Sequence, residues 1–427
     1  MIPDIEKLSP AEIKQAQEKG LRQTLDYVIQ HSPFYQRHFK QYNLDHTKIQ
    51  KLEDLRIVPP TTKDDMQNFN WDFLCVPRNK VVEYTTTSGT LGKPVIIALT
   101  QKDLERLTFN EFISLSCADG TKDDLYQLML TLDRQFMAGI AYYEGIRKIG
   151  AGIIRTGPGL PALQFDSIVE MQPTTLVAVP SFLVKLIEIA HQKGINLNQT
   201  KVKKIVCIGE NIRNADFSLN TLGTKITDHW NVKLFSTYAS TEMQTAFTEC
   251  SYGHGGHHHP GLIITEILDE NDQPAAAGKE GELTITHLGL EGMPLIRYKT
   301  GDVIRWHDEP CSCGRTSARV SPVIGRKQNM IKLKGTTIYP PGIFEILHQA
   351  GVADYVVEVS TNSLGIDDLK LLIVGDEQKK SMITSIFQSK LRILPEVIIT
   401  PSHQIEKIQM SEGSRKPKKF VDLRLPD

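Results

Sequence analysis

Thr85-Thr86-Thr87-Ser88-Gly89-Thr90-Leu91-Gly92-Lys93-Pro94 is a loop rich in hydroxyls and glycines, and it lies between two strand-like runs, residues 81–84 and 95–99. Hydroxyl and backbone N–H groups can surround a polyphosphate, Lys93 adds a positive charge, and glycines let the backbone approach an anion closely. The loop is not a Walker A motif, because Pro94 stands where serine or threonine is required. We therefore expect a polyphosphate-binding loop between two strands, with a plain polar hairpin turn as the alternative.

Three patterns of secondary structure extend outward from this loop. Up to about residue 260, short apolar runs alternate with helical stretches, which predicts an α/β fold with a largely parallel sheet. Residues 261–307 hold strands without helices between them and predict a small antiparallel β unit, and the chain past residue 327 predicts a small α+β domain. The expected strands are residues 176–179, 205–208, 232–235, 262–268, 282–285, 303–306, 355–359, 369–374 and 397–400, and expected helices include residues 182–191 and 380–391.

The composition is that of a globular protein. At roughly 150 residues per domain, a chain of 427 residues holds two or three domains. Lys plus Arg number 49 and Asp plus Glu 50, so the net charge of −1 provides no basic field for nucleic acid. No apolar run approaches the ~20 residues of a membrane span, and the first residues lack the pattern of a signal peptide. We expect a cytoplasmic protein that binds neither nucleic acid nor membrane.

The six cysteines are too few for a disulfide scaffold, so a reducing compartment is expected. Three of them have no metal-binding pattern around them and are interpreted as small buried apolar residues: Cys75, Cys117 and Cys207.

The other three cysteines lie near histidines. Cys250-x₆-His257 is followed by Cys311-x-Cys313, and three thiolates with one imidazole suit a closed, tetrahedral, structural Zn²⁺ site. The alternative is three unrelated reduced thiols. Other histidines could replace the fourth ligand: His254, His258 and His259.

Several motifs, in the right order, resemble those of the adenylate-forming enzymes, the acyl-CoA synthetase (AMP-binding) superfamily. The loop at residues 85–94 is similar to the phosphate-binding loop of that superfamily. The other matching stretches are Tyr238-Ala239-Ser240-Thr241-Glu242, Arg297-Tyr298-Lys299-Thr300-Gly301-Asp302, Gly325-Arg326, Lys334-Gly335 and Ile338-Tyr339-Pro340.

The resemblance implies a nucleotide site made from these motifs. Residues 86–93 hold the ATP phosphates, Asp302 binds the ribose hydroxyls, and Arg326 reaches the ribose or phosphate. The implied neighbours of the adenine are Gly209, Glu210, Tyr238, Ala239 and Ser240, and those of the phosphates are Thr86, Thr87, Ser88, Gly89, Thr90 and Gly92. Taken singly, an Asp after Thr-Gly is more often a turn former, so the set of motifs carries the assignment.

The same resemblance implies the catalytic groups. Thr241 contacts the adenylate phosphate, Glu242 holds Mg²⁺, and Lys93 adds positive charge. In the final motif, Ser411 to Arg424, Lys416 takes the place of the lysine that bridges carboxylate and phosphate, with Lys418 as its rival. A solvated basic tail is the other interpretation of this segment.

Within the superfamily, the chain most resembles the phenylacetate–CoA ligase group, which includes deazaflavin-coenzyme adenylyltransferases. The acyl pocket implied by this likeness lies at residues 136–145 and includes Tyr142 and Tyr143. Glu144 stands where the group has an aromatic residue, which favours another aryl acid or a more polar acid. The matching stretches are residues 31–35, 52–55, 61–63, 293–298 and 311–316, and the group shares the Cys, His, Cys-x-Cys set.

The implied reaction has two steps: a small acid and MgATP form an acyl-adenylate, and CoA then takes the acyl group. Residues 1–326 are expected to form the adenylation domain, with the zinc unit at about 250–320, and residues 327–427 a mobile lid with its hinge at 327–329. Adenylyl transfer, carrier-protein loading and a nucleotide-binding protein without catalysis are the alternatives. The sequence leaves the oligomeric state open, and a homodimer is one alternative.

Overall fold

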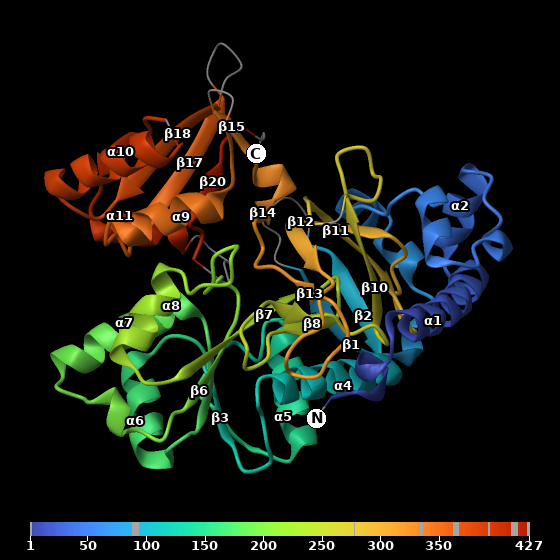
Figure 1. Ribbon diagram of the computed structural model, residues 1–427, viewed down its shortest axis with the longest axis horizontal. Helices are drawn as coiled ribbons and strands as arrows, with labels where there is room; N and C mark the ends of the chain where they lie inside the picture. The colour runs from blue at the N-terminus through green and yellow to red at the C-terminus, as the bar shows by residue number, and fades with distance from the viewer. Residues whose placement is uncertain are drawn as a thin grey trace. The chain divides into compact units, whose positions relative to one another are not determined.

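The computed structural model describes residues 2–87, 94–276, 278–333, 336–361, 367–391, 393–410 and 417–424 (Figure 1). The chain divides into two compact units. The first holds Met1–Leu219 and Gly223–Val323, and the second holds Asn220–Leu222 and Ile324–Asp427. This division falls close to the boundary expected after residue 326.

The N-terminal part of the first unit is helical. Helix α1 (Pro10–His31) begins at a local signal in the sequence: Ser9 is its N-cap, Pro10 is its first residue and Glu12 completes a capping box. Helices α2 (Pro33–Gln41) and α3 (Lys63–Asn68) follow, also with capped starts. The short 3₁₀ turns between the helices are η1 (Asp4–Lys7), η2 (His46–Lys48), η3 (Leu52–Ile57), η4 (Asn70–Phe73) and η5 (Arg78–Lys80).

The central sheet of the first unit is mainly parallel, as predicted. Its strand order is β4-β3-β5-β6-β7-β8, and only the last pair is antiparallel. The strands are β3 (Leu125–Leu128), β4 (Gly152–Arg155), β5 (Thr175–Ala178), β6 (Lys204–Cys207), β7 (Lys233–Ser240) and β8 (Thr245–Thr248).

Helices cover both faces of this sheet (Figure 1), and the alternation of side chains along each strand explains why. On β5, Leu176 packs under α6 (Pro161–Met171), α7 (Pro180–Gln192) and α8 (Thr221–His229), whereas Val177 faces α4 (Gln101–Cys117) and α5 (Met137–Ile149). Both faces are therefore apolar and buried.

An antiparallel sheet completes the first unit, where strands without helices were expected. Its order runs β10-β11-β12-β13-β9. Together with the hairpin β1 (Val81–Thr86) and β2 (Ile96–Thr100), it shares one apolar core with helices α1 and α2. The strands are β9 (Gly256–His257), β10 (Ile263–Leu268), β11 (Glu280–His287), β12 (Tyr298–His307) and β13 (Arg319–Val320).

The second unit is a small α+β domain with its own core. Its main sheet runs β19-β18-β17-β20, and the hairpin β15–β16 lies beside it in the core. Its elements are β14 (Gly325–Arg326), η7 (Lys327–Asn329), β15 (Ile331–Leu333), β16 (Thr336–Ile338), α9 (Pro340–Gln349), β17 (Tyr355–Thr361), β18 (Asp367–Ile373), α10 (Glu377–Leu391), β19 (Glu396–Ile399), α11 (Ser402–Gln409) and β20 (Phe420–Asp422).

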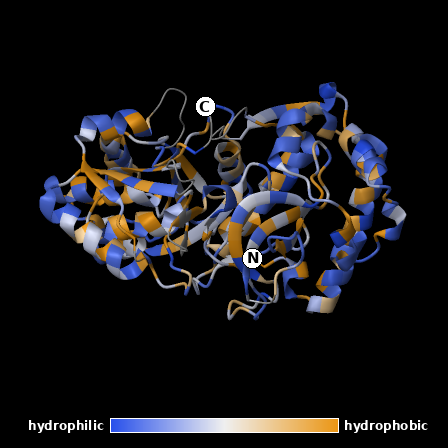
Figure 2. Cartoon of the chain, turned by 90° about the horizontal axis from the view of Figure 1, so that it is seen from above, coloured by the Kyte–Doolittle hydropathy of each residue, from blue (hydrophilic) through white to orange (hydrophobic). Residues whose placement is uncertain are grey.

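Hydrophobic and hydrophilic residues alternate along most helices, as Figure 2 shows, which is the pattern of elements that bury one face. Among the described residues, none of the helices combines the length and the hydrophobicity that crossing a membrane requires.

Candidate active site

The base of the predicted phosphate loop is a tight hairpin between β1 and β2. The Thr87 amide donates to the carbonyl of Val95 (3.0 Å), and the Val95 amide donates to Thr87 Oγ1 (3.1 Å). The Thr86 amide donates to the carbonyl of Gln135 (3.1 Å), which links the loop to the segment before α5. The remaining predicted contacts lie outside the described residues: Ser88, Gly89, Thr90, Gly92 and Lys93.

The motifs predicted for adenine and ribose meet in space. Tyr238 on β7 donates its hydroxyl to Oδ2 of Asp302 on β12 over 2.7 Å, although 64 residues separate them in sequence. Asp302 is buried, and the preceding Gly301 has φ of +78°, a backbone conformation that favours glycine. This hydrogen bond holds the carboxylate of Asp302 beside the hydroxyl of Tyr238.

Thr241 and Glu242 occupy the turn between β7 and β8. The Met243 amide donates to Ser240 Oγ (3.2 Å) and shapes this turn, while Ala239 is exposed on the strand before it. The Glu242 carboxylate lies 3.8 Å from the Lys63 ammonium, at the start of α3. Lys63 belongs to the matching stretch at residues 61–63, to which the sequence assigns no role. The fold brings its positive charge beside Glu242.

Gly209 and Glu210 lie just after β6, which ends at Cys207. Gly209 has a φ of +75°, and the Glu210 carboxylate accepts from the Ser181 amide (2.8 Å) and the Ser181 hydroxyl (3.0 Å). This carboxylate therefore caps the start of α7. An adenine ring beside this turn would meet the backbone of residues 209–210.

The predicted C-terminal residues lie in the second unit. Arg326 ends β14, and a side chain on the preceding Gly325 would collide with the ring of Tyr339. Lys416 lies outside the described residues, whereas the Lys418 amide donates to the carbonyl of Gln409 (2.9 Å). The choice between the two lysines stays a prediction.

The two tyrosines of the predicted acyl pocket lie on α5. Tyr142 is buried and Tyr143 is partly exposed. Burial raises the pKa of Tyr142 well above its usual value, so its hydroxyl stays neutral.

A buried carboxyl group, which the sequence patterns did not single out, packs against Gly145 on α5. Glu111 on α4 is 4% exposed, and burial raises its pKa to about 8. It lies four residues from both Leu107 and Leu115, on the apolar side of the helix. An acidic residue within that apolar spacing is the signal that could have revealed it.

The predicted zinc ligands converge. The ligand atoms of Cys250, His257, Cys311 and Cys313 all lie within 4.8 Å of one another. The Cys250 and Cys311 sulfurs are 3.6 Å apart, and Cys313 Sγ lies 3.5 Å from His257 Nε2. Tetrahedral zinc with bonds of about 2.3 Å separates its ligands by about 3.8 Å. The geometry thus fits a closed four-ligand site.

The other histidines near this cluster have different partners. His258 donates through Nε2 to the carbonyl of Ile263 (2.8 Å), His259 donates to Glu6, and His254 is exposed. His257 is completely buried, and burial lowers its pKa to about 3, so the ring is neutral as a ligand requires. Of the four histidines considered, His257 is the one placed to bind a metal.

A buried ion network surrounds the cluster. Glu6 on η1 accepts from His259 Nδ1 (2.6 Å) and Arg315 Nε (2.8 Å), and Arg315 also donates to Cys313 Sγ (3.4 Å). Cys117, interpreted as a small apolar residue, is indeed buried, but it packs within the same sulfur cluster. These contacts connect the N-terminal turn η1 to the loop that carries Cys311 and Cys313.

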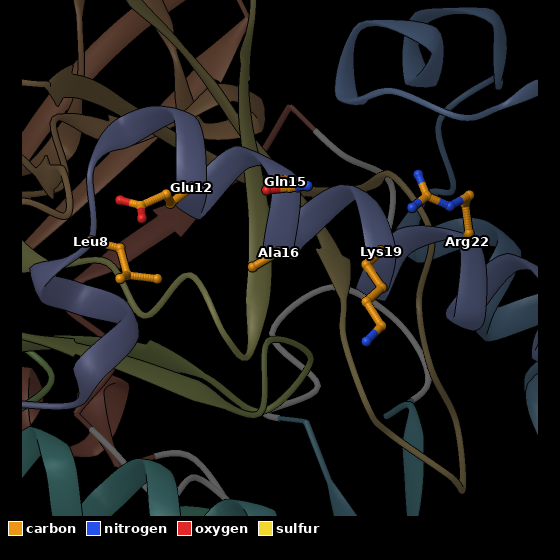
Figure 3. Close-up of a pocket in the computed structure, with 6 residues that line it drawn as sticks. All are labelled: Leu8, Glu12, Gln15, Ala16, Lys19 and Arg22. Carbon is orange, nitrogen blue, oxygen red and sulfur yellow. The ribbon is translucent and has the colours of Figure 1, made fainter.

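Two surface hollows are lined by other residues, although Arg155 in the second lies over the ring of Tyr143. One of about 400 Å³ follows α1 and is lined by the side chains drawn in Figure 3, among them Glu12 and Arg22. The other, of about 350 Å³, lies beyond the carboxyl ends of β3 and β4 and includes Arg155. Neither contains a residue predicted for the site.

Residues 30–290 of this chain match the protein-family model described as "AMP-binding enzyme". This chain belongs to the AMP-binding enzyme family. The chain is 27% identical over 351 residues to a phenylacetate-coenzyme A ligase of Thermus thermophilus, covering 81% of this chain and 77% of that protein. It is 26% identical over 400 residues to the phenylacetate-coenzyme A ligase of Escherichia coli, covering 91% and 88%.

The fold of the family is found across the whole chain. A solved structure of 2-hydroxyisobutyryl-CoA ligase in complex with an adenylate aligns with a TM-score of 0.85 at 22% identity, over 99% of this chain and 92% of the other. The predicted α/β architecture is therefore confirmed.

Proposed function

We propose that this protein is an AMP-forming acid–CoA ligase, which activates a small carboxylic acid with MgATP and transfers the acyl group to CoA. The hydrogen bond between Tyr238 and Asp302 carries the proposal, because it joins two motifs that lie far apart in the sequence and that the resemblance assigns to one nucleotide. The curated relatives named as phenylacetate-coenzyme A ligases, which align with most of this chain, support the same reaction class.

In the first step, a carboxylate oxygen of the acid attacks the α-phosphorus of ATP, an O–P bond forms, and pyrophosphate leaves. Lys63, the loop lysine Lys93 and Lys416 would offset the negative charge that develops on the phosphate oxygens. Mg²⁺ would be held by Glu242 with phosphate oxygens, since hard cations prefer such ligands. In the second step, the CoA thiol attacks the acyl carbon and AMP leaves.

The two compact units receive separate roles in this proposal. Residues 1–326 form the adenylation domain, and residues 327–427 a lid whose hinge is at 327–329. One site can then serve two reactions if the lid changes position between them. Zn²⁺ at Cys250, His257, Cys311 and Cys313 has a structural role, because four protein ligands leave no position for substrate. A cytoplasmic location fits the reduced cysteines.

The test is pyrophosphate release and thioester formation with MgATP against a panel of aryl and short aliphatic acids, with and without CoA. Turnover that needs both an acid and CoA supports the ligase. Acid-dependent pyrophosphate release without a CoA product would instead indicate carrier loading or adenylyl transfer. The control compares ATP binding by the wild type and by Asp302→Ala, and weaker binding by the variant shows that the wild-type site is intact. With that site intact, a lack of pyrophosphate release with any acid would contradict the proposal.

A further inference from the structure

Lys63, the first residue of α3, lies beside the carboxylate that is proposed to hold Mg²⁺. Its ammonium is 3.8 Å from the Glu242 carboxylate, and both side chains are partly buried. A hydrogen bond from an ammonium to a carboxylate is shorter, at about 2.7–2.9 Å. The contact is therefore an ion pair that leaves the N–H donors of Lys63 without a hydrogen bond to Glu242. These donors can serve an anion that binds at the same carboxylate.

The backbone before Lys63 is fixed by the motif that is predicted to hold the ribose. The Thr61 amide donates to the carbonyl of Arg297 (3.0 Å), and the Lys299 amide donates to the carbonyl of Thr61 (2.9 Å). Residue 61 thus pairs with the start of β12, the strand that carries Asp302. Lys63 follows two residues later, so its backbone is held close to the predicted ribose motif.

The segment after α3 reaches the hairpin that carries the predicted phosphate loop. Asn70 in η4 accepts from the Ile96 amide through Oδ1 (3.0 Å) and donates from Nδ2 to the Ile96 carbonyl (2.8 Å). Ile96 begins β2 and follows Val95, whose amide donates to Thr87 at the base of the loop. The segment that contains Lys63 therefore runs from the ribose motif to the phosphate hairpin.

Three parts of the chain that the resemblance assigns to one nucleotide are thus connected to Lys63: the ribose motif, the phosphate hairpin and Glu242. A lysine ammonium is a compact charge on a flexible stem, which suits phosphate oxygens. Thr241 and Lys416 are the residues proposed for the α-phosphate, so the β- and γ-phosphates still lack a cation besides the loop lysine and Mg²⁺. A surface ion pair is the alternative, but such pairs contribute little and need no bonds to two other motifs.

We propose that Lys63 is a further catalytic residue, which binds the β- and γ-phosphates of ATP and the pyrophosphate that leaves. This inference rests on the proposed ligase function and assigns Lys63 to its first step. When the acid's carboxylate oxygen attacks the α-phosphorus, the bond from that phosphorus to the bridging oxygen breaks, and its electron pair stays with pyrophosphate. Lys63 offsets the negative charge that this leaving group gains. The second step releases AMP and does not need Lys63.

The experiment compares ligands that differ in the β- and γ-phosphates. Isothermal titration calorimetry measures the binding of MgATP, magnesium pyrophosphate and AMP to the wild type and to Lys63→Met, which keeps an unbranched side chain without the charge. We expect Lys63→Met to bind MgATP and pyrophosphate at least about tenfold more weakly, and AMP within about threefold of the wild type, because a hydrogen bond to a charged group is lost with the first two ligands alone. A residue that only supports the fold would weaken all three alike.

Further variants separate phosphate binding from folding. Lys63→Arg keeps the positive charge and should restore part of the affinity for MgATP. Lys63→Gln repeats the comparison with a polar side chain in case methionine disturbs the fold, and thermal unfolding checks every variant. Lys40→Met, at an exposed lysine on α2, should behave as the wild type. Thioester formation from a supplied acyl-adenylate and CoA should change by less than about threefold in Lys63→Met, because no pyrophosphate charge develops in that step.

Each outcome decides the inference. Weaker binding of MgATP and pyrophosphate by Lys63→Met, with AMP binding kept, would support it. An equal loss for all three ligands, or no change in any of them, would overturn it while leaving the ligase function intact. If the wild type binds MgATP but forms no thioester with any acid, the proposed function fails, and the binding measurements still decide whether Lys63 holds the β- and γ-phosphates.

Discussion

At the scale of single residues, the nucleotide site depends on contacts between distant parts of the chain. Asp302 and Tyr238 hold one another, so each would present a fixed face to a nucleoside. A hydrogen bond to a charged group contributes about 1.5–3 kcal/mol. We expect Asp302→Ala to raise KM for ATP at least tenfold, with a smaller effect for Tyr238→Phe, measured by pyrophosphate release at saturating acid. An unchanged KM in Asp302→Ala would contradict the ribose assignment.

Glu111 predicts a pH-dependent stability. In the folded protein, its pKa lies at about 8, compared with an ordinary value of 4.5. Between these values the folded state holds a proton that the unfolded state has lost, so the free energy of unfolding falls as pH rises. Glu111→Gln lacks this penalty and should gain stability relative to the wild type from pH 5 to pH 8, by roughly 1–4 kcal/mol. Urea unfolding of both proteins at the two pH values measures this, and a constant difference would argue against it.

The site residues that could be predicted from the sequence are those that belong to a motif. Residues whose surroundings depend only on tertiary packing could not be predicted. Tyr238, Asp302 and Glu242 belong to contiguous motifs, so their roles could be proposed before the fold was known. Lys63 gained a role only when α3 placed it 3.8 Å from Glu242. Glu111 belongs to no motif, and its burial depends on the packing of α5 against α4.

At the scale of elements, buried ion pairs connect the N-terminal turn η1 to the loop that carries Cys311 and Cys313. Glu6 on η1 bonds to His259 and to Arg315. Burial alone would raise the pKa of Glu6, but His259 and Arg315 outweigh that effect and lower it. The stability it provides is therefore complete above pH 4.5 and is lost as pH falls below it. Glu6→Gln should lower the free energy of unfolding at pH 7 by about 3–5 kcal/mol, because Arg315 is left buried without its anion. Asp4→Asn, exposed in the same turn, is the control.

The metal cluster leads to a separate prediction. The purified protein should contain about one zinc per chain, released when Cys311→Ser removes one ligand. Treatment with a chelator should lower the thermal unfolding temperature, while pyrophosphate release at 25 °C continues as long as the protein stays folded. Immediate loss of activity in chelated protein that is still folded would show that the metal is catalytic rather than structural.

The elements themselves were predicted unevenly. The strands β5, β6 and β10–β12 and the start of α1 follow from apolar runs and a capping box. Strands β3 and β4 and helices α4–α6 were not predicted. Helix α4 buries Asp103, Arg106, Asn110 and Glu111, so polar residues interrupt its apolar spacing, and their partners lie far away in sequence. Tertiary contacts, rather than local pattern, decide such elements.

At the scale of the whole molecule, the chain forms two compact units, and the proposed reaction has two chemical steps. Lys416, the lysine proposed as catalytic, should matter for only one of these steps. We expect Lys416→Ala to reduce acid-dependent pyrophosphate release by about 10²–10³, the loss typical for removing one group that stabilises a developing charge. Thioester formation from a supplied acyl-adenylate and CoA should stay within a few-fold of the wild type. Lys418→Ala is the matched control, and if it shows the selective loss instead, the two lysines exchange roles.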